Sequence, residues 1–130
     1  MKNKIRKSIH LDQLVRHNRS KWWTYKDISC DSSWELAFLV YNLEHNVEIK
    51  RNFESFEYIY NDEVHKYFPD FVIEDVYYEI KGYMSDLSKS KIDQVKNKIN
   101  LVVISKNEIQ VYLDYCISKY GSNFCDVLYN

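Results

Sequence analysis

Four short stretches with strand character follow one another between residues 47 and 83, and helical patterns stand on both sides of them. The stretches are residues 47–53, 56–60, 66–73 and 77–83, and the segments ES, NDE and ED that separate them are typical of turns. Consecutive strands joined by such short turns predict a meander. A chain with this pattern is constrained to a fold that contains a β-sheet.

The pattern before the strands predicts a helix with well-marked ends. Ser32 is followed three residues later by Glu35, which is a capping-box spacing, and an apolar stretch begins at the same place. Asn46 marks the expected end. The apolar side chains lie on nearly all sides of this helix, so we expect it to lie deep in the structure.

The pattern after the strands predicts a helix, a strand and a second helix. Residues 85–100 are amphipathic, with lysines around an apolar stripe formed by Leu87, Ile92, Val95 and Ile99. The apolar run 101–105 predicts a strand that is buried on both faces. Residues 109–120 predict a helix with Gly121 as its C-terminal cap. The whole order predicts an α/β fold whose mixed sheet, a three-stranded meander plus a further strand, is flanked by helices.

The composition bounds the class of protein. The chain has 130 residues, of which 45% are hydrophobic and 16% aromatic, and this is enough for one folded core. The longest apolar run, residues 36–41, is too short to span a bilayer, and the basic N-terminus lacks the apolar region of a secretory signal. We therefore expect a cytoplasmic protein without a membrane partner. Its three cysteines form no CxxC pair, so we expect free thiols, and a zinc site from His10, His17 and Cys30 would lack recognised ligand spacing.

The charge is unevenly distributed along the chain. Residues 1–26 carry eight Lys/Arg against Asp12 alone, which is a balance of +7, and the remaining ten bases and eighteen acids give −8. We expect a basic N-terminal arm at residues 1–29 and a core domain with a C-terminal helix at residues 30–130. A basic arm on an acidic body suggests a polyanionic partner, although a solvated terminus would have the same composition.

The strand-like segments contain acidic and basic residues in an arrangement that suits metal-dependent hydrolysis. Pro69 cannot donate a ladder hydrogen bond, so the disturbed pairing could aim Asp70 toward Glu79. Glu79 and Lys81 share one face of their strand, while Ile80 points to the other face and can fill the core. Two carboxylates and a backbone carbonyl suit Mg²⁺, and an adjacent lysine could position or deprotonate the attacking water. Such a set suits the hydrolysis of a phosphodiester.

The tripeptide Glu-x-Lys is weak as a motif, because this chain contains it twice. Residues 48–50 also read EIK, but no Pro-Asp precedes them and no Gly follows them. The distinguishing feature of residues 79–81 is the surrounding order of a strand ending in FPDF, a turn, a strand carrying YEIKG, a basic helix and an apolar strand.

The stretches CDSSWELAFLVYNLEHNVEIKRN, KYFPDFVI and YYEIKGY, within residues 30–105, resemble the PD-(D/E)xK nuclease superfamily. They are similar to its phage- and intron-associated members, which include homing-type endonucleases. The resemblance implies a restriction-endonuclease-like core that needs Mg²⁺ or Mn²⁺ and no small-molecule cofactor. It also implies that Asp70, Glu79 and the Ile80 carbonyl bind the metal, that Lys81 is the catalytic lysine, and that Glu35 completes the site.

Each of these residues also has an explanation without chemistry. The capping box alone explains Glu35. Asp70 could be an Asx-type turn residue after proline. Glu79 and Lys81 could form a cross-strand ion pair on a solvated face.

Basic and aromatic side chains supply the predicted contacts to DNA. The predicted phosphate contacts, with Gln94 as a polar helper, are Arg16, Arg19, Lys21, Lys50, Arg51, Lys89, Lys91, Lys96 and Lys98. The aromatic group Trp22, Trp23 and Tyr25 could stack on bases or could attach the arm to the body.

The predicted function is therefore a Mg²⁺-dependent DNA endonuclease. The resemblance does not separate a homing-type enzyme from a Holliday-junction resolvase or another structure-specific nuclease. A core with one such site would need a homodimer, or two binding events, to cut both strands. Two alternatives stay open. The chain could be a non-catalytic DNA-binding protein with a nuclease fold, or a partner-binding domain without nucleic acid.

Overall fold

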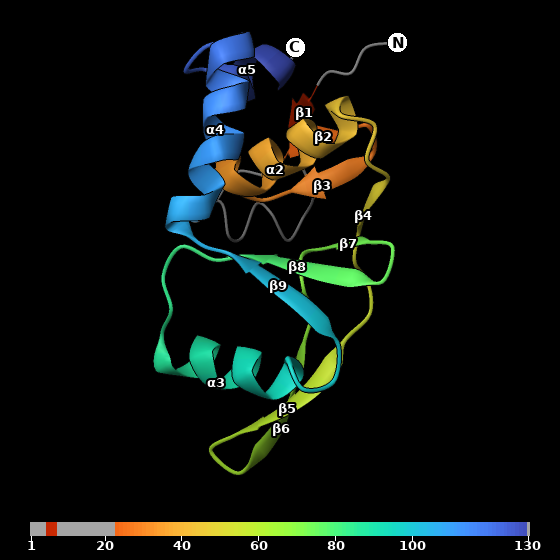
Figure 1. Cartoon of the computed structure of the whole chain (residues 1–130), viewed down its shortest axis with the longest axis vertical. Coiled ribbons are helices and arrows are strands. Elements are labelled where there is room, and N and C mark those ends of the chain that lie inside the picture. Colours follow the sequence, from red (N-terminus) through yellow and green to blue (C-terminus); the bar gives the residue numbers. More distant parts are fainter. Residues whose placement is uncertain (1–4, 8–22, 130) are drawn as a thin grey trace. The chain divides into compact units, whose positions relative to one another are not determined.

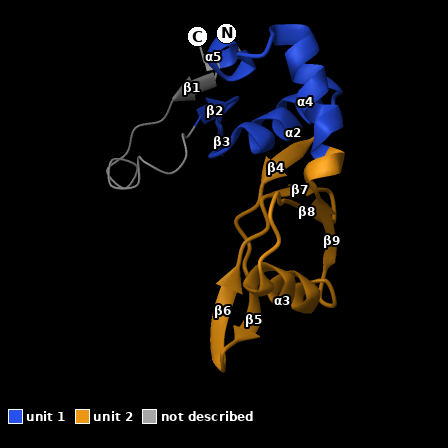
Figure 2. Cartoon of the chain, turned by 90° about the vertical axis from the view of Figure 1, so that its left-hand side faces the viewer, with its two compact units in different colours: residues 1–47, 109–130 blue, residues 48–108 orange. Residues whose placement is uncertain are grey.

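The computed structural model describes residues 5–7 and 23–129, and the chain divides into two compact units. Figure 1 labels the elements, and Figure 2 colours the first unit, residues 1–47 with 109–130, apart from the second, residues 48–108. Each unit combines helices and strands, and the predicted mixed α/β class is confirmed. The boundary expected at residue 29 falls inside a strand of the first unit.

The first unit is built from a small antiparallel sheet and three helical segments. Its strands occur in the order β1-β2-β3, and its helices are α2, the part of α4 from residue 109 on, and α5. The bounds are β1 Ile5–Lys7, β2 Trp23–Tyr25, β3 Ile28–Cys30, α2 Ser33–Glu44, α4 Lys106–Tyr120 and α5 Phe124–Tyr129. Lys26 and Asp27, which join β2 to β3, both have positive φ, as a tight two-residue hairpin turn requires.

Helix α2 begins and ends where the sequence predicts. The Ser32 side chain accepts a hydrogen bond from the Glu35 backbone N–H at 3.1 Å, which confirms the N-cap. Asn46 lies just beyond the helix with a φ of 63°, the left-handed conformation that ends many helices. Residues 36–40 are all buried, as expected for a helix that is apolar on most sides.

Trp23 and Tyr25 belong to the core of the first unit. Both side chains are buried, so these two aromatic residues serve packing and are not exposed for stacking on bases. Trp22 and the predicted DNA contacts Arg16, Arg19 and Lys21 lie outside the described residues.

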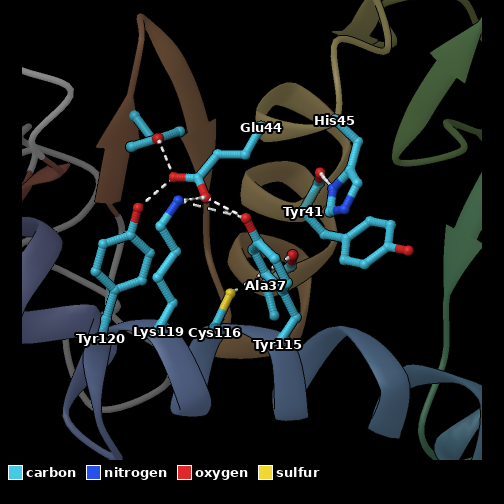
Figure 3. A network of polar contacts seen from close by, with 9 residues as sticks. Ala37, Tyr41, Glu44, His45, Tyr115, Cys116, Lys119 and Tyr120 are labelled. Atoms are coloured by element: carbon cyan, nitrogen blue, oxygen red, sulfur yellow. Dashed lines mark hydrogen bonds and ion pairs between the residues drawn. The ribbon is translucent and has the colours of Figure 1, made fainter.

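Glu44 at the end of α2 is the centre of a polar network (Figure 3). Its carboxylate accepts hydrogen bonds from the Tyr115 hydroxyl at 2.5 Å, from Lys119 Nζ at 2.7 Å and from the Tyr120 hydroxyl; Tyr25 lies at 3.5 Å. Burial alone would raise the pKa of Glu44, but the hydrogen bonds from α4 outweigh it and hold the pKa below its ordinary value. Glu44 therefore ties α4 to α2 as a carboxylate.

The three cysteines are free thiols, and burial raises the pKa of the Cys116 thiol to about 12. Within the described residues, none of the helices combines the length and apolar character needed to cross a bilayer.

The second unit contains a four-stranded mixed sheet in the order β4-β7-β8-β9. The first three strands are antiparallel neighbours and β9 runs parallel to β8, so the sheet is mixed as predicted. The predicted meander of consecutive strands is interrupted, because β4 and β7 are not consecutive in the chain. A separate hairpin, β5 with β6, is inserted between β4 and β7. The bounds are β4 Ile49–Arg51, β5 Phe56–Tyr60, β6 Glu63–Tyr67, β7 Phe71–Ile73, β8 Val76–Ile80, α3 Asp86–Val95 and β9 Asn100–Ile104.

The prediction of one strand over residues 66–73 is wrong. Strand β6 ends at Tyr67 and pairs with β5, whereas β7 begins at Phe71 and pairs with β4 and β8. Pro69 lies between them, and because it has no N–H it cannot continue a ladder. The chain changes sheets at this proline.

Two burial predictions also fail. Strand β9 is the edge of its sheet and Val102 is exposed, so the run 101–105 is not buried on both faces. In α3, Ile92 and Val95 are buried as predicted, but Leu87 in the first turn is exposed.

Helix α3 holds the β5–β6 hairpin through polar and apolar contacts. The Gln94 amide donates to the Ile59 carbonyl and accepts from the Ile59 N–H, both at 2.8 Å, and Lys98 Nζ donates to the Glu57 carbonyl at 2.7 Å. Beneath them Tyr58, Tyr67 and Val95 form a buried cluster. Gln94 therefore pairs with the backbone of an edge strand.

We expect Glu44→Gln to lower the free energy of unfolding at neutral pH by about 1–2 kcal/mol, because it weakens the charge-assisted bonds from α4. The folded-state pKa of Glu44 lies below the unfolded value of about 4.3. Its contribution is therefore present above that pH and is lost as the pH falls through the folded-state pKa. Chemical denaturation at a series of pH values measures both effects.

The control is Asp27→Asn, which neutralises an exposed carboxylate and keeps a residue type that tolerates positive φ. Equal acid sensitivity of wild type and Glu44→Gln would show that the network does not depend on the charge of Glu44.

Candidate active site

The strand register explains how Pro69 and Asp70 reach β8. Strands β7 and β8 pair Phe71 with Tyr78, and the same register continued would set Pro69 opposite Ile80. However, the Pro69 carbonyl accepts a hydrogen bond from Asn52 Nδ2 at 2.9 Å. The Ile80 N–H instead donates to Asp70 Oδ2 at 2.8 Å. The carboxylate of Asp70 thus takes the place of a backbone partner at the point where the ladder stops.

This contact also brings a backbone oxygen toward Asp70. Within an extended strand the N–H and the C=O of one residue point to the same side. Since the Ile80 N–H meets the Asp70 carboxylate, the Ile80 carbonyl lies on the same side of β8. Asp70, Glu79 and the Ile80 carbonyl therefore come from adjacent positions at one end of the sheet.

Glu79 is a buried carboxylate that a tyrosine holds in place. Only 7% of Glu79 is exposed, and its Oε1 accepts a hydrogen bond from the Tyr67 hydroxyl at 2.8 Å. Burial raises the pKa of Tyr67 far above its ordinary value, and the negative charge of Glu79 raises it further. Tyr67 therefore remains a neutral donor. A buried carboxylate is costly unless it is bonded in this way.

Cationic side chains surround the two carboxylates. Arg51 Nη2 lies 3.9 Å from Asp70 Oδ1, and Lys91 Nζ lies 4.7 Å from the centre of the Tyr67 ring. Burial lowers the pKa of Lys91 and the charge of Lys81 lowers it further, while Glu79 and Asp70 oppose this shift. Lys91 thus lies within the electrostatic field of both acids and of Lys81.

The sequence predicts Arg51 and Lys91 as phosphate contacts, and the structure adds that both lie beside the carboxylates. Lys50 and Lys89 are exposed on β4 and α3, where a phosphate contact stays a prediction. Gln94 is bonded to Ile59 in the hairpin.

Asn52 fixes the turn that carries Asp70, and sequence reasoning missed it. Its buried amide donates to the Pro69 and Glu54 carbonyls at 2.9 and 2.8 Å, and its backbone N–H donates to the Asp70 carbonyl at 3.1 Å. A polar residue inside the strand-like segment 47–53 is the only sequence signal. Tyr67 was missed too, because its aromatic ring predicts packing alone.

The oxygen donors fit a small hard cation. Two carboxylates and a carbonyl are all hard ligands, and Mg²⁺ accepts such a partial set because it retains several waters. The described part of the chain has no group of three or more His, Cys, Asp and Glu side chains placed to hold a metal, so waters would have to complete the coordination. Glu35 belongs to the first unit, where it is buried and its N–H is capped by Ser32. Its role as a metal ligand stays a prediction.

Comparisons of the chain with protein-family models, with curated proteins and with solved structures found no match.

We expect Asn52→Ala to lower the free energy of unfolding by about 1–3 kcal/mol, because it leaves the buried Pro69 carbonyl without its donor. Thermal or denaturant unfolding measures the change. Asn97→Ala removes a comparable but exposed amide bond to Asp93 and should change stability by no more than about 0.5 kcal/mol. If the two variants are equally stable, Asn52 does not support the turn.

We expect Tyr67→Phe to cost about 1.5–3 kcal/mol of stability at neutral pH, because the buried Glu79 carboxylate loses a hydrogen-bond donor. The matched control is Tyr60→Phe on the other strand of the same hairpin, where the side chain is only half-buried. Chemical denaturation of both variants provides the comparison. A Tyr67→Phe variant as stable as Tyr60→Phe would refute the importance of this hydrogen bond.

Proposed function

We propose that the chain is a Mg²⁺-dependent DNA endonuclease with a PD-(D/E)xK, restriction-endonuclease-like core. The observation that carries the proposal is the contact of Asp70 with the Ile80 N–H beside the buried Glu79, with Lys91 in the electrostatic field of both acids. The order of three antiparallel strands followed by one parallel strand supports it.

In this proposal Asp70, Glu79 and the Ile80 carbonyl would hold Mg²⁺ or Mn²⁺. When bound, such a cation offsets phosphate charge and increases the acidity of water. The Tyr67 hydroxyl keeps Glu79 oriented, and the Ile80 N–H keeps Asp70 oriented. Preorganised groups of this kind need no rearrangement during the reaction.

The basic side chains would act on the DNA. Lys81 directly follows β8, two residues after Glu79, and stabilises the negative charge that develops at the phosphorus. Lys91 and Arg51 bind the phosphates on either side, as charge-assisted donors to oxygen. Because the described part of the chain offers one such site, cutting both strands would require a homodimer or two binding events.

A second candidate is a non-catalytic DNA-binding protein that keeps the fold. It is favoured by the fact that Asp70 already has structural partners, the Ile80 N–H and Arg51. The two candidates differ in their response to metal: an endonuclease nicks supercoiled plasmid with Mg²⁺ or Mn²⁺, whereas the binding protein leaves it intact.

We expect Asp70→Asn, Glu79→Gln and Lys81→Met each to abolish metal-dependent nicking of supercoiled DNA. Binding without metal should persist in the first two variants, because removing a negative charge reduces repulsion of the phosphates. Affinity should also fall steeply with rising salt as phosphate contacts release counterions. Plasmid nicking and fluorescence anisotropy measure these properties.

The second EIK tripeptide provides the matched control. Glu48→Gln makes the same chemical change as Glu79→Gln in an exposed residue of an identical tripeptide, and should leave nicking unchanged. Full activity of a properly folded Glu79→Gln variant would rule out the assignment of the site.

A further inference from the structure

Three aromatic side chains of the second unit are turned out to solvent. Phe53 is 84% exposed, Tyr83 is 78% exposed and Phe68 is 54% exposed. Among the residues whose side chains the structure describes, every other Phe, Tyr and Trp is buried or half-buried. Folding does not explain these three rings, since burying each would stabilise the chain.

All three rings lie next to the candidate active site along the chain. Phe53 follows Arg51 by two residues, Phe68 precedes Asp70 by two, and Tyr83 follows Lys81 by two. The backbone also links two of these segments, because the Asn52 N–H donates to the Asp70 carbonyl at 3.1 Å. The most exposed rings of the described chain therefore each stand two residues from a charged residue of the candidate site.

Aromatic rings beside cations are the combination that binds unpaired nucleotides. Cationic side chains bind the phosphates along the backbone, and aromatic rings stack on the flat faces of the bases. Every base has such a face. In a duplex those faces are covered by neighbouring bases. Ile59 and Val64 are exposed on the β5–β6 hairpin, but these side chains are aliphatic and offer no such stacking surface.

We propose that the site takes DNA with unpaired nucleotides, such as a single strand, a flap or the open arm of a junction, and that bases stack on Phe53, Phe68 and Tyr83. This inference rests on the proposed function, because it names the substrate class of the same site. It favours a structure-specific nuclease over an enzyme that reads intact duplex.

The test compares binding of one end-labelled oligonucleotide as a single strand and as a duplex with its complement. Fluorescence anisotropy with the full chain, with Ca²⁺ replacing Mg²⁺ at fixed ionic strength, gives the affinities. Phe53→Leu and Tyr83→Leu, which keep apolar bulk but lose the ring, should each weaken single-strand binding roughly tenfold and change duplex binding much less. Phe53→Trp, which keeps a ring, should retain wild-type affinity. Val64→Ala on the hairpin is the control and should change nothing.

Two results would overturn the inference. One is tighter binding of the duplex together with unchanged single-strand binding in Phe53→Leu and Tyr83→Leu. The other is a concentration-dependent dimer of the DNA-free chain, in sedimentation, that both leucine variants dissociate, because the rings would then serve a contact between copies.

Cleavage assays on the same DNAs separate this inference from the proposed function. Metal-dependent cutting confined to the duplex, and unaffected by Phe53→Leu, would leave the endonuclease intact and refute the role of unpaired nucleotides. Ring-dependent single-strand binding without cutting of any DNA would support recognition of unpaired nucleotides and refute the nuclease.

Discussion

The arrangement of the candidate site depends on one hydrogen bond, from the Ile80 N–H to the Asp70 carboxylate. In a continued ladder the Ile80 N–H would donate to the Pro69 carbonyl. That carbonyl already accepts a hydrogen bond from the Asn52 side chain. Three residues thus act together. Pro69 has no N–H to donate, Asn52 binds the Pro69 carbonyl, and Asp70 accepts the hydrogen bond that the Ile80 N–H would otherwise lack. The charge of Asp70 is brought to β8 because the backbone leaves a donor there to be satisfied.

The two units each contain a carboxylate whose position is fixed by tyrosine hydroxyls. Glu44 accepts bonds from Tyr115, Tyr120 and Lys119, all on α4, and this holds its pKa low. Glu79 accepts one from Tyr67, which belongs to the buried cluster beneath α3. A tyrosine can serve both purposes because its ring packs in the core while its hydroxyl reaches a polar partner. In the second unit, the apolar core and the candidate site therefore share a residue.

Local signals in the sequence predict much of this structure. The features that they do not predict depend on which strands and helices contact one another. Ser32 caps the start of α2, and Asn46 and Gly121 follow the ends of α2 and α4, as predicted. These features are predictable because helix caps are decided by a few neighbouring residues. The division of residues 66–73 between two sheets could not be predicted, since strand propensity does not specify the partner strand. The same holds for Lys91 and Gln94: both lie on α3, but one faces the carboxylates and the other the β5 backbone.

The two EIK tripeptides show that pairing, and not the motif, creates the candidate site. In β4 the burial follows hydrophobicity, with Ile49 buried and Glu48 and Lys50 exposed. In β8 the order is reversed, because Glu79 is buried and Ile80 is only half-buried. Our expectation that Ile80 would fill the core was therefore wrong, and the reversal depends on Tyr67, which supplies a donor to the buried acid. Burying a charge in preference to an isoleucine is unfavourable for folding alone, so its presence argues for a role in chemistry.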